Sequence, residues 1–173
     1  MQKATIVCTL FICVFLFASF HPPKKKNDLW QQWNEILQLN AKEKKPILID
    51  VYTTWCYYCK RMDATVYKND SVSAYLKEKF YRFKLNAESK DTLEWNGKKY
   101  GFDKRYKVHE FMKDITQAIV FPSTVIIPPD GQPFSIGGQV DLKEMETLLK
   151  YFTCGYPGKD LTSFAQSIKT EWK

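Results

Sequence analysis

The sequence predicts an α/β domain with a central sheet between helices, and three observations support this fold class. Segments with helical and strand patterns follow one another in the order helix, strand, helix, strand, helix, strand, strand, helix. Residues 47–52 are apolar at nearly every position, which is typical of a strand that is buried on both faces. A Cys-x-x-Cys pair, Cys56 and Cys59, lies between this strand and the start of the next helix.

The first half of the chain supplies the elements around that strand. A helix is predicted from Leu29, because Asp28 is a good N-cap and the following apolar residues fall mostly on one face. After the cysteines the helical pattern continues. Asp70 can cap a short helix over residues 72–80, and residues 81–86 form the second predicted strand.

The second half begins with short β segments around an Asn-Gly turn signal at residues 96–97. A helix is predicted over residues 106–119, and a strand over 120–127 that Pro122 interrupts. The run Pro-Pro-Asp-Gly at 128–131 predicts a tight turn before a returning strand. Two helices complete the predicted fold.

The N-terminus differs in composition from the rest of the chain. Lys3 is followed by an uncharged apolar stretch, so residues 1–20 have the pattern of a signal sequence. The 17 uncharged residues at 4–20 also reach the lower limit of a membrane span, so an uncleaved N-terminal anchor stays open. Residues 21–28 are rich in Pro and Lys and predict a linker, which leaves 29–173 as one domain. We therefore expect an exported protein, periplasmic or otherwise extracytoplasmic.

The overall composition excludes several classes of protein. The chain has 173 residues, enough for one ordinary domain, and its mean hydropathy of −0.39 argues against a polytopic membrane protein. The formal net charge is +7, but the 26 basic residues are interleaved with 19 acidic ones. Because the basic residues form no stripe and no recognition motif is present, nucleic-acid binding is not expected.

The cysteine count indicates a working dithiol. Beyond the N-terminal stretch only Cys56, Cys59 and Cys154 remain, too few for the disulfide framework of a small secreted domain. Half of a zinc site is an alternative, but a second Cys-x-x-Cys or a His pair is missing, and only His21, His109 and Cys154 could complete one. Two core cysteines without a redox role are a further alternative.

A Cys-x-x-Cys pair at a helix N-terminus has a physical logic. The thiolate is the nucleophile, and the unpaired N–H groups and the positive end of the helix dipole stabilise its charge. The first cysteine, Cys56, is then the exposed attacker. Cys59, one turn further on, resolves the mixed disulfide before the partner diffuses away.

Residues 47–60 resemble the active-site strand and turn of thioredoxins. That family also places an acid six residues before the first cysteine, here Asp50 before Cys56. It has a Trp directly before the first cysteine and a Lys after the second, matched here by Trp55 and Lys60. Motifs at this spacing are far more specific than Cys-x-x-Cys alone.

Further motifs follow in the order that the family has them. The next strand carries Lys84, which in thioredoxins comes close to the buried acid, here Asp50. Phe121 and Pro122 stand where thioredoxins carry a cis-proline, and an Asp-Gly pair then fits the family's following β-turn. The resemblance covers roughly residues 45–152 and implies a thioredoxin fold.

The resemblance also implies a role for each matching residue. Cys56 would be the nucleophile and Cys59 the resolving thiol. Asp50 would accept a proton from Cys59, with its pKa raised by burial, and Lys84 would tune Asp50. A structural Asp50 and a solvated strand-end Lys84 are the plain alternatives. The side chains expected to contact substrate are Trp55, Tyr57, Tyr58, Phe121 and Pro122. No metal is expected, and no cofactor beyond the redox-active Cys56–Cys59 disulfide.

The departures from thioredoxins bear on function. Tyr57 and Tyr58 replace the Gly-Pro between the family's cysteines, and the bulky Phe121 precedes the proline. No His lies between the cysteines, as it does in strongly oxidising or isomerising relatives, and this favours a reducing pair. A hairpin and helix insertion is expected at about 87–119, before the cis-proline strand. Similar insertions occur in exported relatives such as the C-terminal domain of the bacterial transmembrane disulfide reductase.

Taken together, these features predict a thiol–disulfide oxidoreductase that exchanges disulfides with exported proteins, as a reductant. We expect a monomer whose partners are disulfide-bearing exported substrates and a membrane or soluble electron donor. An oxidase or isomerase of the same fold is one alternative. A non-catalytic client-binding module, whose cysteines stay paired, is the alternative from another class.

Overall fold

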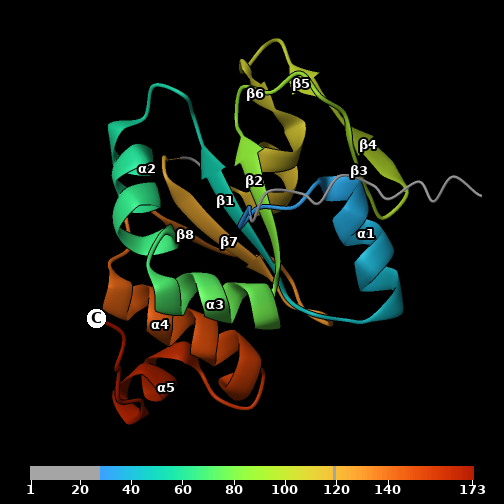
Figure 1. Ribbon diagram of the computed structural model, residues 1–173. Helices are drawn as coiled ribbons and strands as arrows, with labels where there is room; N and C mark the ends of the chain where they lie inside the picture. Colours follow the sequence, from blue (N-terminus) through green and yellow to red (C-terminus); the bar gives the residue numbers. More distant parts are fainter. Residues whose placement is uncertain (1–27, 119) are drawn as a thin grey trace, which may run out of the picture.

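A four-stranded mixed sheet forms the centre of the molecule. The computed structural model describes residues 28–118 and 120–173, and its sheet has the order β2-β1-β7-β8 (Figure 1). The strands are β1 (Ile47–Tyr52), β2 (Tyr81–Asn86), β7 (Ser123–Ile127) and β8 (Phe134–Gly137). β1 pairs in parallel with β2 and antiparallel with β7. The α/β prediction and both early strands are thus confirmed.

Helices cover both faces of this sheet (Figure 1). One face packs against α1 (Trp33–Lys42) and the segment between β2 and β7, and the other against the helices that lie between β1 and β2 or after β8. Those helices are α2 (Tyr57–Met62), the π-helix η1 (Asp63–Tyr67), α3 (Asp70–Lys79), α4 (Leu142–Lys150), the π-helix η3 (Tyr151–Gly155) and α5 (Leu161–Ser167). Each face has its own apolar core, so β1 is buried on both sides as its composition predicts.

The alternation of side chains along the strands decides which residues share a face. Ile47, Ile49 and Val51 belong to the core under α1, whereas Leu48 belongs to the core under α2, α3 and α4. Asp50 follows the same alternation as Leu48. The polar residue of β1 therefore points toward the helices that follow the cysteines.

The first helix begins later than predicted. α1 starts at Trp33, four residues after the predicted start at Leu29. The segment before it is held against β2 instead, because the Gln31 N–H donates to the Arg82 carbonyl at 2.8 Å and the Arg82 N–H donates to Gln31 Oε1 at 3.0 Å. Asp28 accepts the N–H of Trp30 at 3.2 Å but caps no helix.

The insertion between β2 and β7 contains two small antiparallel hairpins and one short helix. The hairpins pair β3 (Leu93–Trp95) with β4 (Lys98–Tyr100), and β5 (Phe102–Asp103) with β6 (Val108–His109). Asn96 and Gly97, with φ of 51° and 76°, turn the first hairpin as their dipeptide predicts.

The helix predicted over 106–119 is wrong in its first part. The backbone of His109 is used in β6, and its N–H also donates to the Ala87 carbonyl at 2.7 Å, so the helix starts only after it. The π-helix η2 (Met112–Thr116) then ends at Gln117, whose φ is 52°.

The predicted element boundaries elsewhere hold with small shifts. β7 begins at Ser123 rather than at 120, because Pro122 has no N–H to donate to the sheet. Asn69, not Asp70, caps α3, with its Oδ1 accepting the N–H groups of Ser71 and Val72. The predicted signal sequence or anchor at 1–20, and all but the last residue of the linker, lie outside the described residues. Among the helices of the described part, none has the length and apolar composition to cross a membrane.

Candidate active site

The two cysteines sit where β1 gives way to α2. Cys56 is the N-cap of α2, and its Sγ is bonded to the Sγ of Cys59 in a disulfide, with the two Cα atoms 5.3 Å apart. The Cys59 N–H also donates to Cys56 Sγ at 3.1 Å. A sulfur in this position receives a backbone N–H and lies at the positive end of the helix, so a thiolate on Cys56 would be stabilised there.

Cys56 is not the exposed member of the pair in this disulfide form. Its exposed fraction is 5%, against 4% for Cys59, so the expectation of an exposed attacker is wrong here. Its sulfur is bonded to Cys59 and receives the Cys59 N–H, so it faces the first turn of α2.

Asp50 is buried on the strand that leads into the disulfide. Its side chain is 2% exposed, and its Oδ2 lies 3.3 Å from Lys84 Nζ. The register of the parallel strands explains this contact, because Asp50 of β1 pairs with Lys84 of β2. The predicted proximity of Asp50 and Lys84 is therefore present.

Lys84 is not a solvated strand-end residue. Besides Asp50, its ammonium binds both carboxylate oxygens of Asp63, and it lies over the rings of Trp30 and Tyr52, at 5.4 and 4.8 Å from their centroids. One cation thus joins two carboxylates that come from β1 and from the helix after the cysteines.

Asp63 is a site residue that the sequence analysis missed. It follows Cys59 by four positions, and residues four apart on a helix lie on the same face. The four-residue spacing from Cys59 could therefore have indicated that Asp63 lies on the same helix face as the second cysteine. The contact itself depends on β2 presenting Lys84 to both carboxylates, which no local pattern reveals.

The pKa of Asp50 lies near neutrality. Burial raises it from 3.8 to about 7, while the charge of Lys84 lowers it and the charge of Asp63 raises it. The Oδ1 atom of Asp50 has no hydrogen-bond partner within the described residues, so the carboxylate form is incompletely solvated. A carboxyl group with this pKa can take up and release a proton at neutral pH.

Tyr67 and Thr124 extend the buried polar group, and neither was predicted. Thr124 of β7 pairs with Asp50 across the sheet, and its Oγ1 lies 3.3 Å from the Tyr67 hydroxyl. Burial, together with the nearby charge of Asp50, holds the pKa of Tyr67 well above its ordinary value. The phenol is therefore a neutral hydrogen-bonding group at neutral pH.

Aromatic side chains surround the disulfide at the surface. Trp55, Tyr57 and Tyr58 are 64%, 69% and 55% exposed. The ring of Phe121 meets that of Trp55 edge-to-face at 6.0 Å, and the Phe121–Pro122 peptide bond is cis. Contact between Phe121 and Trp55 brings the predicted cis-proline loop beside the cysteines.

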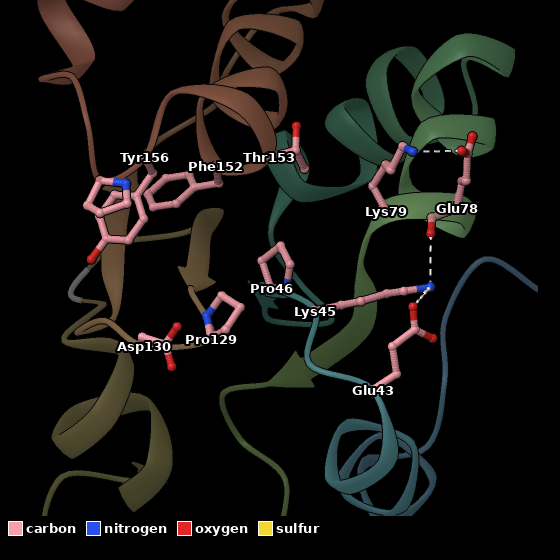
Figure 2. A pocket seen from close by; sticks show the side chains of 11 residues that line it. Glu43, Lys45, Pro46, Glu78, Lys79, Pro129, Asp130, Phe152, Thr153 and Tyr156 are labelled. Carbon is pink, nitrogen blue, oxygen red and sulfur yellow. Dashed lines mark hydrogen bonds and ion pairs between the residues drawn. The ribbon is translucent and has the colours of Figure 1, made fainter.

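A pocket of about 710 Å³ lies at the other end of the sheet (Figure 2). Its lining includes Pro46, directly before β1, whereas Cys56 follows the opposite end of the same strand. Ion pairs at its rim involve Lys45 with Glu43, and Lys79 with Glu78 (Figure 2). This pocket is separate from the disulfide chemistry.

Cys154 and His109 also lie away from the disulfide. Cys154 is an exposed free thiol, and its neighbour Thr153 lines the pocket at the far end of β1. His109 is buried in the insertion, where its Nδ1 accepts the Phe111 N–H at 3.1 Å and its Nε2 lies 3.0 Å from the Asp91 carbonyl. Neither residue can complete a zinc site with Cys56 and Cys59 in this arrangement.

The fold and the position of the cysteines agree with a family model. The model of the thioredoxin-like domain matches residues 33–153, which contain the sheet, the disulfide and the cis-proline. The chain belongs to the thioredoxin-like family. Its Cys-x-x-Cys disulfide, at the junction of β1 and α2, makes this thioredoxin-like protein a thiol–disulfide oxidoreductase by fold and site.

Several solved structures share this thioredoxin-like fold. A thioredoxin from Thermus thermophilus is 18% identical, with a TM-score of 0.54, and the match covers 75% of this chain and 92% of that one. A thioredoxin-fold protein from Helicobacter pylori is 17% identical, with a TM-score of 0.55, covering 71% and 81%. The DsbH oxidoreductase is 14% identical, with a TM-score of 0.54, covering 80% and 93%.

A human protein shows similarity in sequence. Spermatogenesis-associated protein 20 from Homo sapiens is 27% identical over 110 residues, which cover 63% of this chain. The matched part is 12% of the human protein's length, so this chain corresponds to a small portion of it.

Proposed function

We propose that this protein reduces disulfides in exported proteins through the Cys56–Cys59 pair. The observation that carries the proposal is the combination of a disulfide at the start of α2 with a buried carboxyl group of pKa about 7 on the strand before it. In a thioredoxin-fold protein without catalytic activity, a buried and partly unpaired acid would only destabilise the fold, because its desolvation costs several kcal/mol.

The reaction consists of two thiol–disulfide exchanges. In the reduced protein, the Cys56 thiolate attacks one sulfur of the client disulfide, forms a mixed disulfide and releases the other client sulfur as a thiolate. The Cys59 thiolate then attacks Cys56 Sγ, which restores the Cys56–Cys59 disulfide and releases the second client thiolate. Two electrons pass from the protein to the client, and the two client thiolates take up protons.

Asp50 would serve the second exchange. Cys59 is buried and must lose its proton to attack, and a nearby base of pKa about 7 can accept that proton at neutral pH. Lys84 stabilises the carboxylate of Asp50, and Asp63 shares Lys84 with it. Trp55, Tyr57, Tyr58, Phe121 and Pro122 would contact the client around the sulfur under attack.

The direction and location of the reaction are parts of the same proposal. The absence of a His between the cysteines favours a reductant, and the apolar residues 4–20 favour export to a periplasmic or other extracytoplasmic compartment. A dithiol donor, in the membrane or in solution, would return electrons to the pair. We propose that the protein acts as a monomer and needs no cofactor other than its own disulfide.

Insulin reduction tests this function. With dithiothreitol as donor, the protein should accelerate the appearance of turbidity, and the Cys56→Ser variant should not exceed the rate of dithiothreitol alone. No acceleration by the wild type would contradict the proposal and favour a client-binding module. Equilibration with glutathione then gives the direction: a potential more negative than that of glutathione supports a reductant, and a less negative one indicates an oxidase or isomerase.

A further inference from the structure

The outer surface of α2 combines aromatic rings with positive charge beside the disulfide. Tyr57 and Tyr58 pack edge-to-face at 5.4 Å and are the residues between the two cysteines. Lys60 and Arg61 are also exposed; Lys60 follows Tyr57 by three positions, and Arg61 follows Tyr58 by three and Tyr57 by four. Residues three or four apart on a helix are neighbours, so Tyr57 has both cations beside it and Tyr58 has Arg61.

No acid of residues 28–118 and 120–173 neutralises the positive charge of Lys60 and Arg61 on this face through an ion pair. Asp63 is the acid nearest to them along the chain, and two acids near the site have other partners. Asp63 binds Lys84, and Glu88 accepts the indole N–H of Trp55 at 3.1 Å.

Trp55, the residue before Cys56, adds a further exposed aromatic ring next to the disulfide. Its ring is held in place by two contacts, the hydrogen bond to Glu88 and the edge-to-face packing with Phe121 at 6.0 Å. An aromatic side chain fixed in this way loses little conformational entropy on binding, so it can contribute contact area efficiently. In the chain, Cys56 thus stands between one fixed aromatic residue and a pair of aromatic residues followed by two cations.

We propose that this surface selects acidic, aromatic client segments. The occupant is an extended peptide in which the cysteine to be reduced has an aromatic neighbour, packed on Trp55, Tyr57 or Tyr58, and an Asp or Glu that pairs with Lys60 or Arg61. Charge complementarity across such a surface raises the association rate and disfavours basic segments. This inference rests on the proposed function, since it names the substrate class of that site.

Three matched peptides test the selection. Each has one cysteine joined by a disulfide to 2-nitro-5-thiobenzoate, so that thiol release is followed by absorbance. The cysteine is flanked by Phe and Glu in the first peptide, by Phe and Lys in the second, and by Ser and Glu in the third. The protein is reduced beforehand and freed of reductant, and the second-order rate constant with each peptide is measured in a single turnover.

The first peptide should react about five- to tenfold faster than the second, and this ratio should fall in high salt because the charges are exposed. The rate constant of the first peptide should also exceed that of the third by a few-fold, since packing of an aromatic ring contributes at this scale. Because each ratio is taken within one protein sample, a general loss of reactivity in a variant cancels.

Two variants assign the selection to these side chains. The double variant K60Q/R61Q should bring the ratio of Glu to Lys peptide close to one, whereas K143Q/K169Q, which removes two exposed lysines elsewhere, should preserve it. Equal rates with all three peptides, or a ratio unaffected by K60Q/R61Q, would overturn the inference and leave the oxidoreductase proposal standing. If the reduced protein reacted with none of the three peptides and not with the neutral dipyridyl disulfide, both the oxidoreductase proposal and this inference would be overturned.

Discussion

Lys84 and Asp50 face each other on adjacent parallel strands, with the lysine Nζ 3.3 Å from a carboxylate oxygen that is buried from solvent. The same ammonium also binds Asp63, which belongs to the helix after the cysteines. The lysine is thus shared between a buried and a partly exposed acid. Burial raises the pKa of Asp50 to about 7; Lys84 lowers this pKa, and the charge of Asp63 offsets part of that lowering.

Replacing Asp50 with Asn should stabilise the protein in a pH-dependent way. The pKa of Asp50 is raised from 3.8 to about 7, so the folded state holds a proton that the unfolded state has lost between these values. Stability contributed at this position therefore falls as the pH rises from about 4 to 7 and then levels off. At about 1.4 kcal/mol per pH unit the upper limit is about 4 kcal/mol, and we expect Asp50→Asn to gain about 1–4 kcal/mol at pH 8.

Urea unfolding of both proteins at pH 4 and pH 8 measures this difference. The two proteins should be nearly equal in stability at pH 4, which serves as the internal control. A variant that is less stable than wild type at pH 8 would show that Asp50 is a structural partner of Lys84 rather than a tolerated buried acid.

The same Asp50→Asn variant should be slow in the second exchange of the reaction. Loss of a general base commonly costs about 10²-fold or more in rate. A mixed disulfide between Cys56 and a chromogenic thiol, followed in rapid mixing, should therefore resolve about 100-fold more slowly at pH 7. The first exchange, attack by Cys56, should change much less. Equal slowing of both steps would assign Asp50 to the environment of Cys56 instead.

Changes at Asp63 and Lys84 should move the pKa of Asp50 in opposite directions. Asp63→Asn removes a neighbouring negative charge, so the pKa of Asp50 should fall below about 7. Lys84→Gln removes the favourable positive charge, so the pKa should rise. Carboxyl carbon resonances, followed by NMR across pH in each variant, report both shifts. Shifts of the same sign in the two variants would contradict the shared-lysine arrangement.

Cys154 should be dispensable for disulfide exchange. It is an exposed thiol whose neighbour Thr153 lines the pocket at the far end of β1 from the disulfide. Cys154→Ser should keep insulin reduction within about two-fold of wild type, because no thiol at that distance can exchange directly with Cys56 or Cys59. A tenfold loss, measured on samples confirmed to be monomeric, would indicate a further catalytic step.

Glu146 should anchor the C-terminal segment. This fully buried carboxylate accepts the N–H groups of Glu171 and Trp172 and pairs with Lys150. Burial acts to raise the pKa of Glu146, but the hydrogen bonds from Lys150, Trp172 and Glu171 outweigh it, so the pKa is lowered. The stabilisation by Glu146 is therefore present at neutral pH and is lost as the pH falls through the pKa of Glu146 in the folded protein. Glu146→Ala should cost about 3 kcal/mol, since it leaves Lys150 and two N–H groups without their acceptor.

Urea unfolding and hydrogen exchange at residues 168–173 check this anchor. Glu171→Gln is the matched control, because it keeps the backbone N–H that Glu146 binds. Unchanged protection of the segment in Glu146→Ala would show that the aromatic contact between Trp172 and Tyr75 is sufficient to hold it.

The sequence by itself determined the two central strands of this protein and the place of the cysteines after the first of them. Strand β1 follows from local composition, because burial on both faces leaves an apolar run. Strand β2 alternates apolar and polar residues, and the cysteines stand between β1 and the next helical pattern. The pairing of Asp50 with Lys84 was available only through the resemblance to thioredoxins, since it depends on the register of paired strands whose partner residues are 34 positions apart.

The tertiary structure alone decided the details of the site. Asp63 reaches Lys84, and Tyr67 reaches Thr124, only because packing brings the helix after the cysteines over strands that are distant in sequence. In the same way Gln31 binds Arg82 and delays the start of α1, and Cys56 is buried in the disulfide form. Periodicity reports which face of an element is buried, but not which side chain from another element meets it there.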